Sequence, residues 1–341
     1  MDSEIYHGAA VADVPVDTYP FPTYSRRSRG GKGRSDTLLL FQMSTGSPLS
    51  GYLLRRPEPI AINYHNITPS TVFYDWDSRV ADELDRGRDE LSALSRRTVH
   101  AIAVSRYNEE ELVSAGFSST SVAPILFDTD GFDNPADRET GEWLDRDRSR
   151  GGKNILFVGR VVPNKAHHDL IAAFAAFRRL YDPHARLYLV GGCPVPTYQS
   201  ALRRLAYDLG VHRAIDFSGF VTDEQLAAYY QAADVFVCLS DHEGFCVPLL
   251  EAMFHGVPIV AYAAGAVPET LGDGGLLLPN KGPVAVAAAV HRVVEDEVLS
   301  KTLARAGEAR LADFSLEASR RAFRSSLTKA LESVESYNRA G

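Results

Sequence analysis

The sequence has few cysteines, no long hydrophobic run and no excess of basic residues, and each of these absences excludes a class of protein. Its 341 residues include three cysteines, Cys193, Cys238 and Cys246, with no pair at a zinc-motif spacing. Three cysteines cannot form a disulfide framework, which favours a reducing, cytoplasmic setting. The formal net charge of −8 argues against general nucleic-acid binding. No run of 18 apolar residues is present, so no transmembrane helix is predicted.

The first residues also lack the features of a secretory signal. Residues 1–6 have neither a basic segment nor an apolar one, so no signal peptide is expected. Basic residues gather only later, between Arg26 and Arg34, within a segment rich in glycine and serine. This segment is either a solvated loop or an electrostatic contact to an anionic lipid or a phosphorylated acceptor at the inner membrane face.

What is present is the composition of a globular protein of two domains. Apolar residues make up 45% of the chain and charged residues 23%. The length favours two domains of ordinary size. Residues 128–153 are polar and rich in Asp, Arg and Gly, which is typical of a linker. We therefore expect an amino domain over 1–140, a linker over 141–153 and a second domain over 154–313.

Short apolar runs alternate with segments of helical spacing along both domains. This alternation predicts an α/β fold with parallel sheets. The expected strands in the first domain are 37–41, 60–64, 101–104 and 120–126, and those in the second are 154–158, 186–190, 215–217, 235–239, 258–261 and 276–278.

A stretch of acids and glycine follows the apolar run 235–239. Pro248 stands where a helix would begin, since proline is favoured at the first helical position. Glu243 then lies in the turn between strand and helix, and Glu251 lies about one turn into the helix. Gly244 and the first backbone N–H groups of the helix lie between these acids. Such a helix start is an anion site.

Two carboxylates beside an anion site need an explanation, and a nucleotide-sugar supplies one. Its diphosphate would sit at the helix start, its sugar hydroxyls would donate to Glu243, and its ribose hydroxyls would donate to Glu251. The alternative is that Glu243 caps the helix and Glu251 forms a surface ion pair.

Two further loops follow expected strands. Gly159 lets the backbone turn after 154–158, and Arg160 and Lys165 then offer two cations suited to phosphate. A solvated basic loop is the alternative. Ala264–Thr270 follows 258–261, and its small residues allow close approach of a ligand or a helix; Glu269 there either caps a helix or contacts the donor.

These candidate residues share a position in the fold. His65, Arg160, Glu243 and the pair Phe220-Val221 each follow an expected strand. In open α/β sheets ligands bind beyond the carboxyl ends of the strands. We therefore expect these residues to border one cleft between the two domains.

The ordered set of motifs resembles the family-4 retaining glycosyltransferases, which have the GT-B fold of two Rossmann-like domains facing a cleft. The resemblance covers about residues 154–280. It is carried by Gly159-Arg160 with Lys165, by Ser218–Val221, by Glu243-Gly244-Phe245 with Glu251, and by Gly265–Thr270. Residues 36–125 are similar to the acceptor-side domain, mainly through Tyr64–Pro69 and Ser105–Leu112.

The resemblance implies a role for each matching position. Arg160 and Lys165 would hold the donor diphosphate, Glu243 would contact the transferred sugar, and Glu251 would bind the ribose. His65 would face the sugar and the β-phosphate from the other domain, unless it only caps the turn before Pro69. The remaining donor-binding positions are Gly159, Phe220, Val221, Gly244, Phe245, Cys246 and Val247. No metal and no cofactor are implied.

The amino terminus differs from the pattern of this family. The amino domain of this fold normally opens with a strand, a glycine-rich turn and a long helix, whereas residues 1–6 are similar to its second strand. We therefore expect the first βα unit to be absent, in a truncated or shortened member of the family. An exposed sheet edge would invite association with a partner. The last residues, 314–341, would form a helix that crosses back to the amino domain.

The implied function is transfer of a hexose from a nucleotide diphosphate sugar to a hydroxyl of a glycan, a lipid-linked sugar or a small molecule. Two alternatives stay open. A protein without the first βα unit could bind a nucleotide-sugar without catalysis, as a scaffold. A nucleotide-sugar epimerase would use the same fold and change the donor with no acceptor present.

Overall fold

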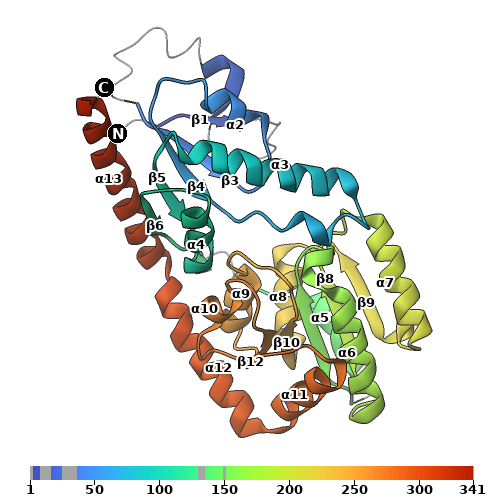
Figure 1. Cartoon of the computed structure of the whole chain (residues 1–341). Coiled ribbons are helices and arrows are strands. Elements are labelled where there is room, and N and C mark those ends of the chain that lie inside the picture. The colour runs from blue at the N-terminus through green and yellow to red at the C-terminus, as the bar shows by residue number, and fades with distance from the viewer. Residues whose placement is uncertain (1–2, 8–16, 25–36, 130–134, 149–150, 341) are drawn as a thin grey trace.

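The computed structural model describes residues 3–7, 17–24, 37–129, 135–148 and 151–340, and the side chains of 335–340 are outside that description. The basic segment Arg26–Arg34 lies outside the described residues. Two lobes are built around separate parallel sheets, and a long carboxy-terminal helix runs along the side of the first lobe (Figure 1).

The first lobe holds a four-stranded parallel sheet whose strands follow chain order. The strands are β3 (Leu39–Met43), β4 (Ile60–Tyr64), β5 (Thr98–Ala103) and β6 (Thr120–Val122). Every residue of β4 is buried, and its sequence is apolar except for Asn63, whose side-chain amide donates to Gln42 Oε1 at 2.8 Å. The helices of this lobe include α2 (Pro48–Leu53), α3 (Ser78–Ser95) and α4 (Arg106–Ser114).

The second lobe holds a six-stranded parallel sheet. In sheet order its strands are β12 (Leu276–Leu278), β11 (Ile259–Tyr262), β10 (Val235–Cys238), β7 (Asn154–Val158), β8 (Arg186–Val190) and β9 (Ile215–Gly219). Chain order reverses between β10 and β7. Such a reversal is the topological switch point at which α/β sheets bind ligands.

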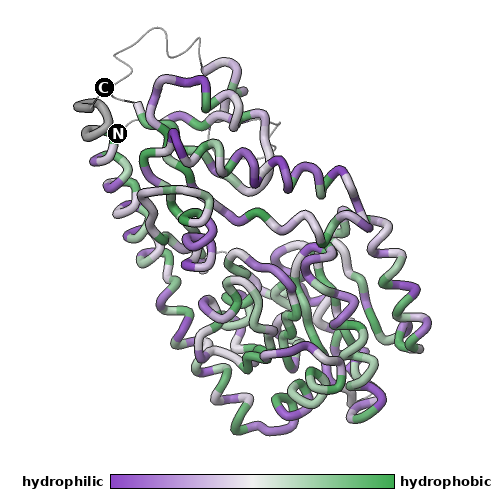
Figure 2. Tube along the Cα trace, viewed as in Figure 1, coloured by the Kyte–Doolittle hydropathy of each residue, from purple (hydrophilic) through white to green (hydrophobic). Residues whose placement is uncertain are grey.

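Helices connect the strands of the second sheet. They are α6 (His167–Leu180), α7 (Pro196–Asp208), α8 (Asp223–Ala232), α9 (Val247–Phe254), α10 (Val267–Leu271), α11 (Pro283–Glu295) and α12 (Glu297–Leu311). Hydrophobic residues concentrate along the strands and the facing sides of the helices, as Figure 2 shows. The expected α/β class with parallel sheets is confirmed.

The polar segment expected as a linker over 141–153 is largely helical. Its first part belongs to α5 (Arg138–Arg148), which packs against α8. Leu144 is fully buried, and the Trp143 ring meets the Tyr229 ring edge-on at 6.3 Å. Two apolar side chains on one face therefore anchor a helix that the overall polarity of the segment concealed.

The amino-terminal strand lies apart from the main sheets. β1 (Ile5–His7) pairs in parallel with β2 (Thr18–Pro20), and the two form a small sheet of their own. Within the described residues β1 has no ladder to β3, so the expectation that residues 1–6 supply a strand of the main amino-terminal sheet is wrong for this structure.

The last helix, α13 (Leu316–Ala340), returns from the second lobe to the first (Figure 1). It packs against β5 and β6, and the Ser121 hydroxyl donates to the Ser326 hydroxyl at 2.8 Å. None of the described helices is both long enough and apolar enough to span a bilayer.

Candidate active site at the switch point

The loops after β7 and β10 are bonded to each other at the switch point. Asp241 N donates to Asn164 O at 2.8 Å, and Asn164 Nδ2 donates to His242 O at 3.3 Å. Ala166 then takes a left-handed backbone, with φ of 50°, and α6 begins at the next residue. The cation loop and the acid loop, which lie far apart in the sequence, are thereby held as one unit.

Lys165 and Glu243 form the central contact between these loops. Lys165 Nζ lies 2.6 and 2.7 Å from the two carboxylate oxygens of Glu243, and the side chains are only 19% and 7% exposed. Burial would lower the pKa of Lys165, but the carboxylate outweighs it and holds that pKa above its ordinary value. The cation expected at the diphosphate and the acid expected at the sugar are therefore already paired.

The helix start behind Glu243 has the expected form. α9 carries Pro248 in its first turn, and its cap residue Cys246 has a left-handed backbone with φ of 74° and no side-chain cap. Gly265 passes so close to this loop that an added Cβ would lie 2.4 Å from Glu243 O, and Ala266 N donates to the same oxygen at 2.9 Å. The small residues after β11 thus support the backbone of Glu243.

Glu251 lies one turn into α9 and is bonded to α8. Tyr230 OH donates to Glu251 Oε2 at 2.7 Å. Burial raises the pKa of Glu251, and the Tyr230 hydrogen bond opposes this shift. The acid expected to hold the ribose is therefore fixed in orientation by its neighbour.

The first lobe reaches the site through Asn66, which the sequence analysis did not single out. An added Cβ on Gly244 would lie 2.4 Å from Asn66 Cβ. Asn66 Oδ1 lies 3.0 Å from both His242 Nε2 and Asn108 Nδ2. His65, the residue before it, contacts Gln42 Oε1 at 2.7 Å through Nε2. His65 is therefore bonded within its own lobe, whereas Asn66 contacts the second lobe.

The hydrogen bonds of His242 define its tautomer. Since Asn66 Oδ1 only accepts, Nε2 carries the proton, and Nδ1 accepts from Tyr107 OH at 3.3 Å. Burial lowers the pKa of His242, in agreement with a neutral ring. No local sequence signal marks this network, because its members come from two separate loops and from α4.

Glu269 caps a helix, but one of the other lobe. Its carboxylate oxygens lie 2.8 and 3.0 Å from Arg106 N and 3.4 Å from Tyr107 N, at the start of α4. Ser105 caps the same helix through Asn108 N. The sequence left open whether Glu269 caps a helix or contacts the donor, and in the structure it caps a helix.

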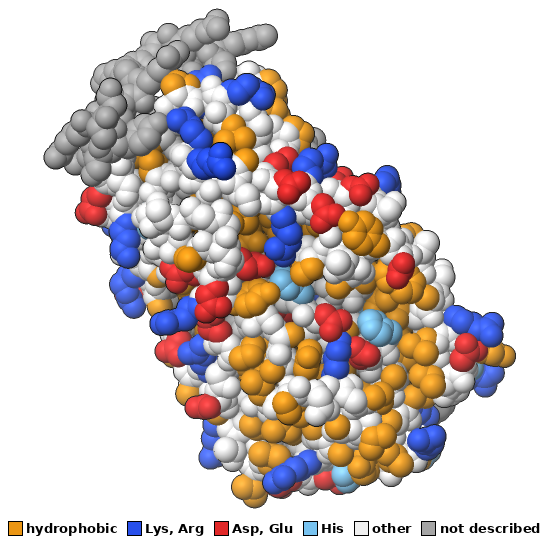
Figure 3. Space-filling view, in the orientation of Figure 1, with side chains coloured by type: hydrophobic (Ala, Val, Ile, Leu, Met, Phe, Trp, Pro, Cys, Tyr) orange, Lys and Arg blue, Asp and Glu red, His pale blue; other side chains and the backbone are white. Residues whose placement is uncertain are grey.

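Other expected residues follow the ends of β7 and β9. Arg160 is exposed at the end of β7, and Phe220, which is 90% exposed, stands at the end of β9 beside Gly192. Phe220 and Val221 border a hollow of 400 Å³ together with Trp143 and Tyr229. Acidic, basic and histidine side chains lie together across the middle of the face drawn in Figure 3.

Residues of the second lobe match a known family. The family model described as glycosyl transferases group 1 matches residues 144–310. The chain is 33% identical over 215 residues to a GDP-mannose-dependent α-(1-6)-phosphatidylinositol monomannoside mannosyltransferase of Mycobacterium tuberculosis, covering 60% of this chain and 54% of that protein. It is 32% identical over 255 residues to a D-inositol 3-phosphate glycosyltransferase of Frankia alni, covering 72% and 61%.

Solved structures show the same fold. Anabaena Alr3699/HepE in complex with UDP and glucose has a TM-score of 0.64 and 22% identity, over 80% of this chain and 72% of that one. The pneumococcal O-GlcNAc transferase GtfA in complex with UDP and GlcNAc has a TM-score of 0.66 and 15% identity, over 91% and 60%. The GT-B fold that the resemblance implied is confirmed. The chain spans just over half the length of the curated relatives named above.

Proposed function

Because residues 144–310 belong to the glycosyl transferases group 1 family, we propose that the chain transfers a hexose from a nucleotide diphosphate sugar to a hydroxyl acceptor, with retention of configuration. The observation that supports this most directly is the pairing of Lys165 with Glu243 beside the start of α9. It puts a cation, helix N–H groups and a carboxylate within reach of one diphosphate sugar.

Each part of the donor has a binding group in this proposal. The diphosphate binds at the start of α9 and contacts Lys165 and Arg160. Its negative charge competes with Glu243 for Lys165, so the ion pair between Lys165 and Glu243 weakens. Glu243 is then free to accept from a sugar hydroxyl. Glu251 accepts from the ribose, the backbone at Phe220-Val221 meets the base, and His65 approaches from the first lobe.

Such a site needs neither a side-chain nucleophile nor a metal. The departing phosphate takes the proton of the acceptor hydroxyl on the face of the sugar that it leaves, and the new bond forms on that same face. Cations and helix N–H groups stabilise the negative charge that grows on the phosphate, and electrostatic stabilisation of this kind supplies most of the rate enhancement in many enzymes. Retention and independence from divalent metals both belong to this proposal.

The relatives suggest the first substrates to test. One is named as GDP-mannose-dependent and as acting on a phosphatidylinositol monomannoside, and another as acting on an inositol phosphate. We propose GDP-mannose as the first donor, with inositol phosphates and phosphatidylinositol mannosides as acceptors. A lipid acceptor would be met at the cytoplasmic membrane face, where Arg26–Arg34 could contact anionic lipid.

The test is a transfer assay of the purified full chain with GDP-mannose, UDP-glucose and related donors against these acceptors, with a chelator present. We expect a product whose anomeric proton, read by NMR, has the donor's configuration. Glu243→Gln should reduce kcat at least about tenfold, the effect of losing one charge-assisted bond, whereas Glu308→Gln, an exposed acid of α12, should not.

Other outcomes point to the alternatives. Binding of GDP or UDP by calorimetry without turnover over the whole panel would favour a non-catalytic binding protein. A change of the donor in the absence of acceptor would favour an epimerase. An inverted product, or full activity of Glu243→Gln, would contradict the proposal.

A further inference from the structure

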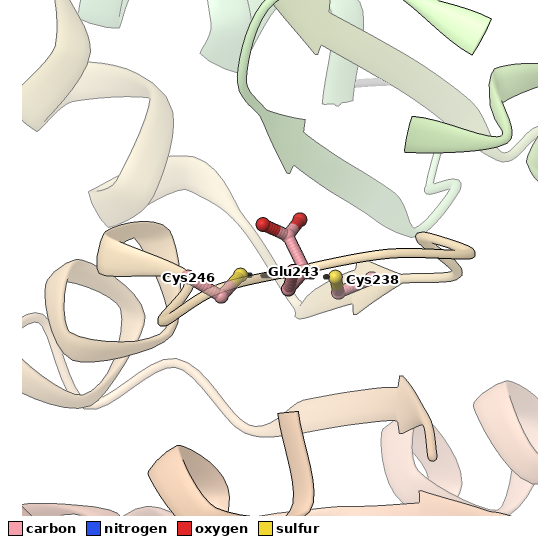
Figure 4. Close-up of side chains that lie close together, drawn as sticks. All are labelled: Cys238, Glu243 and Cys246. Atoms are coloured by element: carbon pink, nitrogen blue, oxygen red, sulfur yellow. Dashed lines mark hydrogen bonds between the residues drawn. The ribbon is translucent and has the colours of Figure 1, made fainter. Parts of the chain in front are cut away.

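Two of the three cysteines meet at the acid loop. Cys238 ends β10 and Cys246 caps α9, and their sulfur atoms lie 3.9 Å apart with Glu243 on the loop between them (Figure 4). The two sulfurs and one Glu243 oxygen all lie within 4.8 Å of one another. All three side chains are buried. In the sequence the cysteines are eight positions apart and match no zinc motif, so only the fold brings this set together.

The separation of the sulfurs fits one class of ion. Two thiolates at 2.3 Å from a tetrahedral zinc ion stand about 3.8 Å apart, and the observed distance is 3.9 Å. Two thiolates and a carboxylate are a ligand set for zinc or cadmium, and unsuited to magnesium or calcium, which select oxygen ligands. We propose that Cys238, Cys246 and Glu243 form a site for a thiophilic divalent cation, with the fourth position open to water.

Charge balance supports this site. Without the ion, the buried group contains one cation, Lys165, and one anion, Glu243, with both thiols protonated in a hydrogen-bonded pair. A divalent cation that binds both sulfurs releases two protons, so two positive charges enter and two leave. The net charge of the buried group does not change, and the desolvation cost that usually opposes burial of an ion is small.

Ser240 supplies a further contact at this site. Its hydroxyl lies 3.5 Å from Cys238 Sγ and is able to donate to a thiolate there.

Occupation of this site would block the donor. A Glu243 oxygen bound to the cation is no longer available to a sugar hydroxyl, while the other oxygen keeps its contact with Lys165. This consequence rests on the proposed function, whereas binding of the cation does not. The cation is thus an inhibitor of the transfer and no part of its mechanism.

The test uses the full chain in a phosphine reductant. Such a reductant keeps the cysteines reduced, and it does not compete for the metal ion as a thiol reductant would. Titration with cadmium should give a thiolate-to-cadmium charge-transfer band in the ultraviolet that saturates at one ion per chain. Calorimetry of zinc binding in buffers of different ionisation enthalpy should report release of about two protons per ion.

Cys238→Ser and Cys246→Ser should each weaken binding by more than the ~10–100-fold typical of losing a supporting residue. Cys193→Ser is the matched control, since Cys193 lies apart, with its sulfur near Val161 O and Val195 O. Absence of the band from the wild-type chain, or its persistence in both Ser variants when circular dichroism shows them folded, would overturn the site. If cation binding follows these cysteines but no transfer is found with any donor, the proposed function fails and the site stands.

Discussion

Lys165 and Glu243 show how one buried pair serves both the fold and the site. Removing one partner leaves the other charge buried, which costs roughly 3–5 kcal/mol in fully buried pairs. Because both side chains keep some exposure, we expect Lys165→Met to lower the free energy of unfolding by about 2–3 kcal/mol, which is less than in a fully buried pair. Transfer should fall at least about tenfold with the loss of the cation.

The double variant Lys165→Met/Glu243→Gln distinguishes the contribution of the ion pair to stability from that of side-chain packing. Since it leaves no unpaired charge, urea unfolding should find it more stable than Lys165→Met alone. A double variant as unstable as the sum of the two single changes would mean that the pair contributes nothing to stability.

His167, two residues after Lys165, gives the fold a dependence on pH. Its ring is fully buried against the Phe157 ring, at 4.6 Å between centroids, and burial lowers its pKa to about 3. The unfolded chain binds this proton below about pH 6.5, whereas the folded chain does not, so stability falls as the pH drops from 6.5 towards 3. By pH 5 the loss is about 2 kcal/mol from this group.

His167→Leu should therefore flatten the pH dependence. We expect the difference in unfolding free energy between pH 7.5 and pH 5 to be smaller by about 2 kcal/mol than in the wild-type chain. His212→Gln, at an exposed histidine, serves as the control and should leave the difference unchanged. An equal pH dependence in wild type and His167→Leu would show that the ring is protonated in the folded chain.

At the scale of elements, α4 is the helix whose start joins the two lobes. Its first N–H groups point at Glu269 of α10, so a carboxylate of one lobe complements the positive end of a helix in the other. Because the cap joins two lobes that each have their own sheet, its loss should affect their junction more than either core.

Glu269→Ala should therefore lower the unfolding free energy by about 1 kcal/mol, as loss of a cap usually does. Amide hydrogen exchange at Arg106 and Tyr107 should increase in the same variant. Asp273→Asn, a change at an exposed acid just after α10, should alter neither quantity. Unchanged exchange at the start of α4 in Glu269→Ala would contradict the capping role.

At the scale of the whole molecule, α13 ties the end of the chain to the first sheet. Ala330 and Ser326 are buried on this helix, whereas Thr328 is exposed. A charge at position 330 would be buried without a partner, which the structure tolerates only at a cost of several kcal/mol. The same charge at position 328 meets water.

Ala330→Asp should accordingly lower the melting temperature by several degrees and increase hydrogen exchange in β5 and β6, against which α13 packs. Thr328→Asp is the matched control and should change little. If Ala330→Asp raised exchange in the second sheet but not in β5, the helix would stabilise the second lobe instead.

Local sequence was sufficient to predict the elements and their class. The expected strands Ile60–Tyr64 and Asn154–Val158 match the observed strands residue for residue, because strands buried on both faces are nearly continuous apolar runs, here with one asparagine in each. Pro248 marked the start of α9 for an equally local reason, namely its fixed backbone angle.

Which distant residues meet depended on the assembled fold. The pairing of Lys165 with Glu243, the bridge from Asn66 to His242, the cap of α4 by Glu269 and the approach of Cys238 to Cys246 all join separate turns. Periodicity and capping act over a few neighbouring residues, whereas these contacts depend on strand order and on how two sheets face each other. The helical part of 141–153 was not predicted, because it is stabilised by packing against α8 and local sequence does not show that contact.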